Sequence, residues 1–67
     1  MENRIRELRA EKKFTQADLS QMVQVSRQSI VAIEKGKYNP SLELAFKIAK
    51  AFDLTIEEVF IFSEKED

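Results

Sequence analysis

The fold is decided by residues 15–37, which read TQADLSQMVQVSRQSIVAIEKGK. Thr15 suits a helix N-cap, because its hydroxyl can accept an N–H of the first turn, and Asp18 favours the same helix start. Ser26 suits a second N-cap. The stretch therefore predicts two short helices, the first over 16–23, joined by so few residues that they must cross steeply.

The second of these helices, expected to end near Lys35, has two chemically different faces. A helical wheel places Ile30 on the buried side and Gln28 with Lys35 on the opposite side, flanked by Val31 and bordered by Arg27. Gln can pair with adenine, Arg with guanine, and a Val methyl can touch the thymine methyl. An ordinary solvated face is the alternative, but this face has no acid and exposes a valine without structural need. The pattern favours DNA readout.

The rest of the chain predicts more short helices, because helical periodicity dominates and the sequence has one Gly and one Pro. Gly36 suits the left-handed residue that ends a helix. The apolar run Val59–Phe62 can be extended, and residues 63–67 are expected to fray. We expect an all-α fold with one domain over 1–67. The further helices are expected at 3–13, 42–52 after a cap at Ser41, and 56–59 after a Thr55–Glu58 capping box.

The composition excludes several kinds of chemistry. The chain has 67 residues with neither His nor Cys, which rules out disulfides, Cys-based zinc sites and catalysis by His or a thiol. We expect no catalytic residue, no cofactor and no metal, so an enzyme is the weakest hypothesis. No apolar stretch suits a membrane span or a signal peptide, which suggests a cytoplasmic protein that is nucleoid-associated when bound to DNA.

The net charge of −1 conceals an asymmetry along the chain. Residues 1–50 carry ten Lys/Arg and six Asp/Glu, a net +4, whereas residues 51–67 carry one Lys and six Asp/Glu, a net −5. A basic body with an acidic tail suggests a side that faces a polyanion, although solvated surface charge is the simpler alternative.

Three motifs at fixed spacing carry a family resemblance: Thr-Gln at 15–16, Ser-x-Gln-Ser-Ile at 26–30 and Ile-Glu-x-Gly-Lys at 33–37. Together they resemble the Cro/C1-type (Xre-like) helix-turn-helix family, which includes the lambdoid phage repressors. The resemblance covers roughly residues 4–60. It implies a compact five-helix lambda-repressor-like domain, with the helix-turn-helix motif at about 15–35, that regulates transcription as a sequence-specific repressor.

The resemblance also assigns residues to DNA. Arg27 and Gln28 would contact bases, Gln16 would bond a phosphate, and the loop after the recognition helix would lie along the backbone. Two alternatives stay open: Gln16 as an ordinary helix-start residue, and Tyr38 as a ring covering the core beside Pro40. The expected DNA-binding residues are Gln16, Ser26, Arg27, Gln28, Ser29, Val31, Lys35, Lys37, Tyr38 and Asn39.

Two further positions follow from the resemblance. Arg9 and Glu34 match a structural salt bridge between the first and third helices. The family usually has Gly where Gln24 stands, and a non-Gly residue with positive φ costs about 1 kcal/mol or more. Either Gln24 is strained or the turn takes a different path.

The apolar residues of segment 55–62 are expected to form a homodimer surface. Ile56 and Val59 would point mainly inward, while the following residues would be shared across the dimer, where the run Val59–Phe62 could pair as an antiparallel strand with its mate. The alternative is that Ile56, Val59 and Phe60 close the core of the monomer. The expected partners are a palindromic double-stranded DNA operator and a second copy, with no small-molecule ligand and no membrane. The alternative is a protein-interaction or antitoxin-like module that retains the fold. The expected interface residues are Ile56, Val59, Phe60, Ile61 and Phe62.

Overall fold

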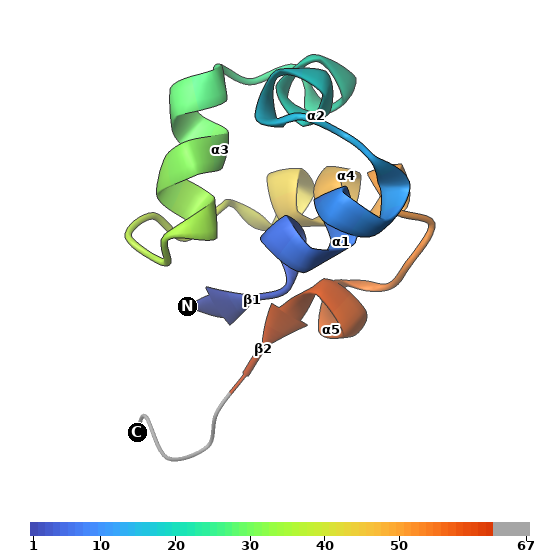
Figure 1. The fold of residues 1–67 in the computed structure, drawn as a ribbon. Helices are drawn as coiled ribbons and strands as arrows, with labels where there is room; N and C mark the ends of the chain where they lie inside the picture. The colour runs from blue at the N-terminus through green and yellow to red at the C-terminus, as the bar shows by residue number, and fades with distance from the viewer. Residues whose placement is uncertain (63–67) are drawn as a thin grey trace.

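The computed structural model describes residues 1–62 and contains five helices and a two-stranded antiparallel sheet (Figure 1). The expected fraying of 63–67 lies outside the described residues. None of the helices in the described part has the length and apolar character needed to cross a membrane. The elements are β1 (Glu2–Asn3), α1 (Ile5–Lys12), α2 (Gln16–Val23), α3 (Arg27–Glu34), α4 (Leu42–Ala51), α5 (Ile56–Val59) and β2 (Phe60–Ile61).

The predicted starts of α2, α3, α4 and α5 are confirmed, because each cap residue satisfies the N–H group three residues on. The predicted start of the first helix at residue 3 is wrong, because Asn3 pairs in β1 and α1 begins at Ile5. Thr15 Oγ1 accepts from the Asp18 N–H at 2.9 Å, and the Asp18 carboxylate accepts from the Thr15 N–H at 2.9 Å, which completes a capping box. Thr55 forms a second capping box with Glu58. Single caps at the starts of α3 and α4 are provided by Ser26 and Ser41.

The first four helices all end in the same backbone motif. Each is followed by a left-handed residue, after which an N–H bonds the carbonyl five residues earlier. Gly36 is the only glycine among the four, so three side-chain-bearing residues occupy a conformation that favours Gly. Gln24, with φ of 62°, is one of them, which confirms the strained alternative at that turn. The four left-handed residues are Lys13, Gln24, Gly36 and Asp53.

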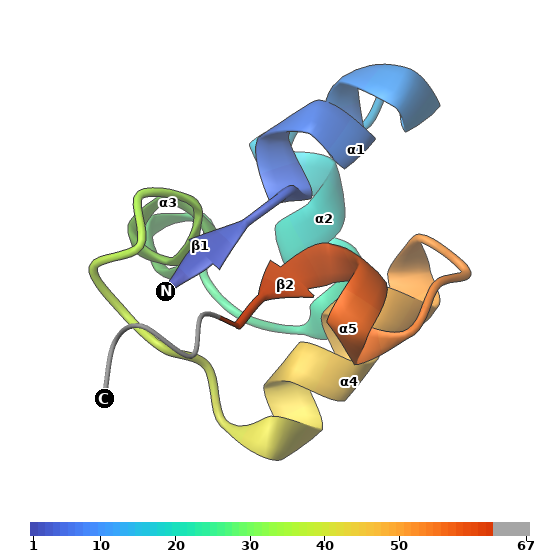
Figure 2. The same cartoon turned by 90° about the horizontal axis from the view of Figure 1, so that it is seen from below.

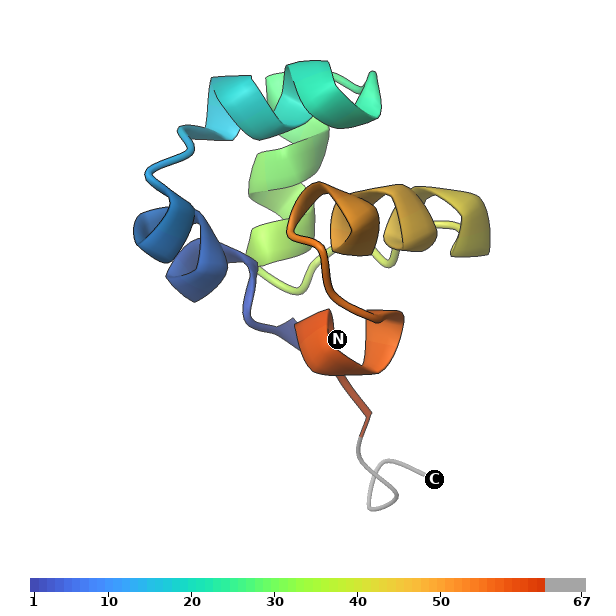
Figure 3. The same cartoon turned by 90° about the vertical axis from the view of Figure 1, so that its right-hand side faces the viewer.

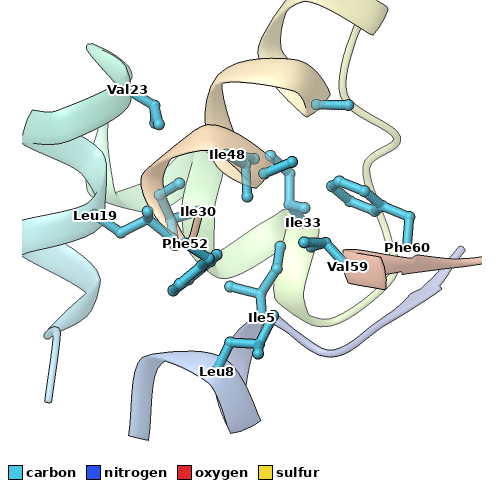
Figure 4. Close-up of a cluster of buried hydrophobic side chains, with 12 residues drawn as sticks. Ile5, Leu8, Leu19, Val23, Ile30, Ile33, Ile48, Phe52, Val59 and Phe60 are labelled. Carbon is cyan, nitrogen blue, oxygen red and sulfur yellow. The ribbon is translucent and has the colours of Figure 1, made fainter. Parts of the chain in front are cut away.

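One apolar core joins all five helices (Figure 4). Phe52 and Phe60 are its largest fully buried side chains, and Phe14 packs on Phe52 with a ring separation of 5.9 Å. α3 contributes only Ile30 and Ile33 to this core, so the rest of its surface stays available. The full set is Ile5, Leu8, Leu19, Val23, Ile30, Ile33, Ala45, Ile48, Ala49, Phe52, Val59 and Phe60.

The C-terminal segment forms a strand pair within the chain and corrects the prediction for Phe60. β2 pairs with β1, with Glu2 opposite Ile61 and Asn3 opposite Phe60, which occupies one of its two edges. Pairing of the other edge with a dimer mate stays a prediction. Phe60 is 1% exposed and was wrongly expected to be shared across a dimer. It faces the core because residues of a strand alternate between faces, which leaves Ile61 outward.

Candidate nucleic-acid interface

α2 and α3 cross at one end of the molecule and bring their N-terminal ends to the same side (Figures 1 and 3). The left-handed Gln24 turns the chain, and the Val25 N–H closes α2 by donating to the Ser20 carbonyl at 3.0 Å. The core residues of both helices fix this crossing, since Leu19, Val23 and Ile30 are almost fully buried. The opposite side of α3 therefore projects from the body.

The projecting side of α3, here called the reading face, consists of Arg27, Gln28, Val31, Ala32 and Lys35. The Arg, Gln and Lys residues are exposed, and their side chains form no hydrogen bond or ion pair with another residue in the described part. Val31 is half-buried rather than fully exposed, and it lines two surface depressions. With Gln16 and Lys37, the reading face lines one of these depressions, of about 520 Å³. The side chains of this depression offer a ligand the cationic hydrogen-bond donors of Arg and Lys, the amides of Gln and the methyl groups of Val and Ala.

Behind the reading face lies the anchor cluster, which consists of Arg9, Gln16 and Glu34. The predicted salt bridge is confirmed: Arg9 donates from Nε and Nη2 to the two Glu34 carboxylate oxygens. Arg9 Nη1 also donates to the Phe14 carbonyl at 3.0 Å. The two charged side chains are 16% and 8% exposed, so both charges are largely withdrawn from water and depend on each other.

Gln16 belongs to this cluster, a contact that the sequence did not predict. Its amide nitrogen donates to the second Glu34 oxygen at 3.2 Å. An amide nitrogen carries two hydrogens, so one remains for a further acceptor. Gln16 also lines both depressions beside α3, and the anchor cluster therefore orients it toward a ligand on this surface.

An open groove of about 580 Å³ separates the N-terminal end of α2 from α1 and α3. Its walls include four cationic side chains, of which Arg6 was not among the predicted site residues; its spacing of three from Arg9 could have indicated a shared side of α1. The one acid in the wall, Glu34, is already paired with Arg9. The groove suits an anion. The described residues contain no group of three or more Asp or Glu placed to hold a metal ion.

The remaining predicted site residues lie around α3. Ser26 and Ser29 occupy its start, where their hydroxyls are 3.1 Å apart, and neither lines the two depressions. Lys37, Tyr38 and Asn39 form the exposed loop after α3. The Tyr38 side chain is 49% exposed and lies outside the core, which speaks against a core-covering role beside Pro40.

The predicted dimer residues separate into buried and exposed ones. Val59 and Phe60 are buried and Ile56 is half-buried, whereas Ile61 and Phe62 are 44% and 61% exposed. Sequence reasoning missed a second exposed apolar pair on α4. Leu42 and Phe46 are 77% and 55% exposed, and their spacing of four residues was the signal for a shared outward side.

Comparisons with known proteins agree with this architecture. The helix-turn-helix family model matches residues 5–59. An uncharacterized HTH-type transcriptional regulator of Archaeoglobus fulgidus is 54% identical over 98% of this chain and 93% of its own. The cryptic phage CTXphi transcriptional repressor RstR of Vibrio cholerae is 34% identical over 92% of this chain and 56% of its own.

A solved structure shares the fold as well. The restriction-modification controller protein C.AhdI of Aeromonas hydrophila is 34% identical and superposes with a TM-score of 0.77 over 82% of this chain and 83% of its own. The family model and the relatives thus match this chain over most of its length, which agrees with the observed fold. The chain belongs to the Cro/C1-type helix-turn-helix family of transcriptional regulators.

Proposed function

We propose that this protein is a sequence-specific DNA-binding repressor that binds a palindromic operator as a homodimer, with α3 in the major groove. The observation that supports this most directly is the reading face, where Arg27, Gln28 and Lys35 project into solvent without partners among residues 1–62. Polar side chains with two donors or a donor and an acceptor are those that distinguish base pairs in the major groove.

Affinity and specificity would come from different residues. Arg6, in the groove between α1, α2 and α3, and Lys37, in the loop after α3, suit phosphates, which position the protein on the duplex. Gln28 and Arg27 suit base edges, and each good bidentate pair contributes about 1–3 kcal/mol of discrimination. Val31 suits a thymine methyl. Gln16, oriented by its hydrogen bond to Glu34, offers its remaining N–H to a phosphate of the DNA backbone.

Dimerisation would use the exposed apolar residues Ile61 and Phe62, which follow the strand pairing. One helix-turn-helix domain reads about half of a site, and two-fold dimers read two half-sites about one helical turn apart. Sedimentation of wild type and Phe62→Ser tests this proposal. We expect wild type to sediment as a dimer and the variant to shift toward monomer; a monomeric wild type at the DNA-binding concentration would contradict it.

The salt dependence of binding to a random-sequence duplex tests the DNA-binding proposal. The affinity should fall steeply as salt rises. The logarithm of the binding constant plotted against the logarithm of the salt concentration should have a slope of about −0.9 per phosphate neutralised. Absence of binding at low salt would contradict the proposal.

A protein-binding module is the second candidate, and the exposed Leu42 and Phe46 pair favours it. A protein-binding groove on α3 would instead call for apolar anchors, whereas α3 presents Arg27, Gln28 and Lys35. The same salt titration separates the two candidates, because only the regulator requires random-duplex binding.

A further inference from the structure

Asn3, in strand β1, bonds to three separate elements. Its side-chain amide donates to the Ile33 carbonyl at the end of α3 at 2.9 Å, and its side-chain oxygen accepts from the Ile5 N–H at the start of α1 at 3.1 Å. Its backbone pairs with Phe60 of β2. Figure 2 shows β1 lying between the end of α3 and β2. One residue thus joins the end of the reading helix to the C-terminal strand.

The end of α3 is a point where the backbone changes direction. Gly36 is left-handed with φ of 76°, its N–H donates to the Ile33 carbonyl at 2.9 Å, and the Lys37 N–H donates to the Ala32 carbonyl at 3.1 Å. The Ile33 carbonyl therefore accepts from both Gly36 and Asn3. The exposed loop 37–39 follows directly, so its position depends on how firmly this turn is held.

The surroundings of Asn3 require an amide. Ile33 is 1% exposed and Asn3 is half-buried, so the Asn3–Ile33 bond is partly sheltered from competing water. A carboxylate at this position would place an acceptor against a carbonyl, and a serine hydroxyl is too short to span both contacts. The amide supplies the donor for α3 and the acceptor for α1 at the same time.

The geometry points to Asn3 as a positioning residue that fixes the end of α3 and the loop 37–39 for DNA contact. Asn3 itself does not contact DNA and acts through the Ile33 carbonyl. This inference rests on the proposed function, because it assigns the loop 37–39 to the DNA backbone. It also connects β2 to the C-terminal end of α3 through Asn3.

The test variant is Asn3→Ser. Serine can keep the local turn to the Ile5 N–H, in which a short side-chain oxygen accepts from a backbone N–H two residues on, but it cannot reach Ile33. It also adds no charge near the DNA. The matched control is Ala49→Gly, which weakens the middle of α4 and makes none of the Asn3 contacts.

Two measurements separate positioning from general stability. The first is NMR hydrogen exchange of the Gly36 and Lys37 amides, which needs no DNA. The second is affinity for the duplex that wild type enriches from a random pool, measured where circular dichroism shows every variant fully folded. We expect Asn3→Ser to speed exchange at these two amides and weaken binding, each about fivefold, as loss of one hydrogen bond implies. Ala49→Gly should leave the affinity unchanged.

Three results would overturn the inference. Equal affinity for Asn3→Ser and wild type, with or without faster exchange, would reduce Asn3 to a structural role. Equal loss of affinity in Asn3→Ser and Ala49→Gly would assign the effect to stability. If wild type does not bind the duplex, both the proposed function and the positioning role are wrong. If wild type binds and Asn3→Ser binds equally well, only the positioning role is wrong and the proposed function stands.

Discussion

Arg and Gln each occur in two settings that lie far apart in the sequence but line the same surface of the molecule. In the anchor cluster, Arg9 and Gln16 both donate to Glu34 inside the protein. On the reading face, Arg27 and Gln28 are exposed and have no partner among the described residues. Residue type alone therefore does not mark a DNA contact. The donors that the fold leaves unused are those available to DNA, and those it uses stabilise and orient α3.

Because the anchor cluster is buried and the reading face is exposed, we expect the largest loss of stability from a substitution at Glu34. Replacing Glu34 by Ala leaves the Arg9 charge largely buried and unpaired, and we expect a loss of about 3–5 kcal/mol in the free energy of unfolding. Urea denaturation measures this loss. The matched control is Arg27→Ala, which should change stability by no more than about 0.5 kcal/mol. Similar losses in both variants would remove the distinction between the two regions.

Gln28→Ala should have the next largest effect, on DNA alone. The variant loses a group suited to one base pair, so we expect discrimination at that base pair to fall by about 1–3 kcal/mol while stability stays unchanged. Competition binding with single-base variants of the enriched duplex measures the change. Uniform loss across all positions would assign Gln28 to the phosphates instead.

Gln24→Gly tests the turn that sets α2 against α3. Gly relieves the positive φ of 62°, so we expect the protein to become more stable by about 1 kcal/mol or less. Thermal or urea unfolding measures the gain. Base preference should stay the same, because Gln24 belongs to neither the anchor cluster nor the reading face. A change in preference would show that the turn itself selects the α3 orientation.

Lys37→Ala should have the smallest effect. Lys37 lies at the edge of the reading face, and we expect its loss to weaken binding about equally across sequences and to reduce the salt slope by about 1. Titrations at several salt concentrations measure the slope. If Lys37→Ala and Gln28→Ala changed affinity in the same sequence-dependent way, the division between phosphate and base contacts would fail.

Helix starts were predictable because their chemistry is local. A cap needs only a hydroxyl and the N–H three residues on, and Thr15, Ser26 and Thr55 each met that condition. The faces of α3 were predictable for a similar reason, since Ile30 and Ile33 define the buried side by spacing alone. These local rules gave the five helices and the residues of the reading face.

Contacts between distant segments were not predictable in the same way. β1 has two residues, too few for any periodic pattern, and its pairing with Phe60 joins opposite ends of the sequence. Lys13 and Asp53 take left-handed conformations without the glycine that would have signalled them. The Gln16–Glu34 bond depends on how α2 and α3 cross, which spacing along one helix does not specify.

The central claim is that the reading face of α3 selects base pairs in duplex DNA. In vitro selection from a random duplex pool, run in parallel with wild type and Gln28→Ala, tests it most directly. We predict that wild type enriches a palindromic sequence and that the variant loses preference at one base pair in each half-site. A pool without an enriched sequence, or the same sequence preferred equally by both proteins, would contradict the claim.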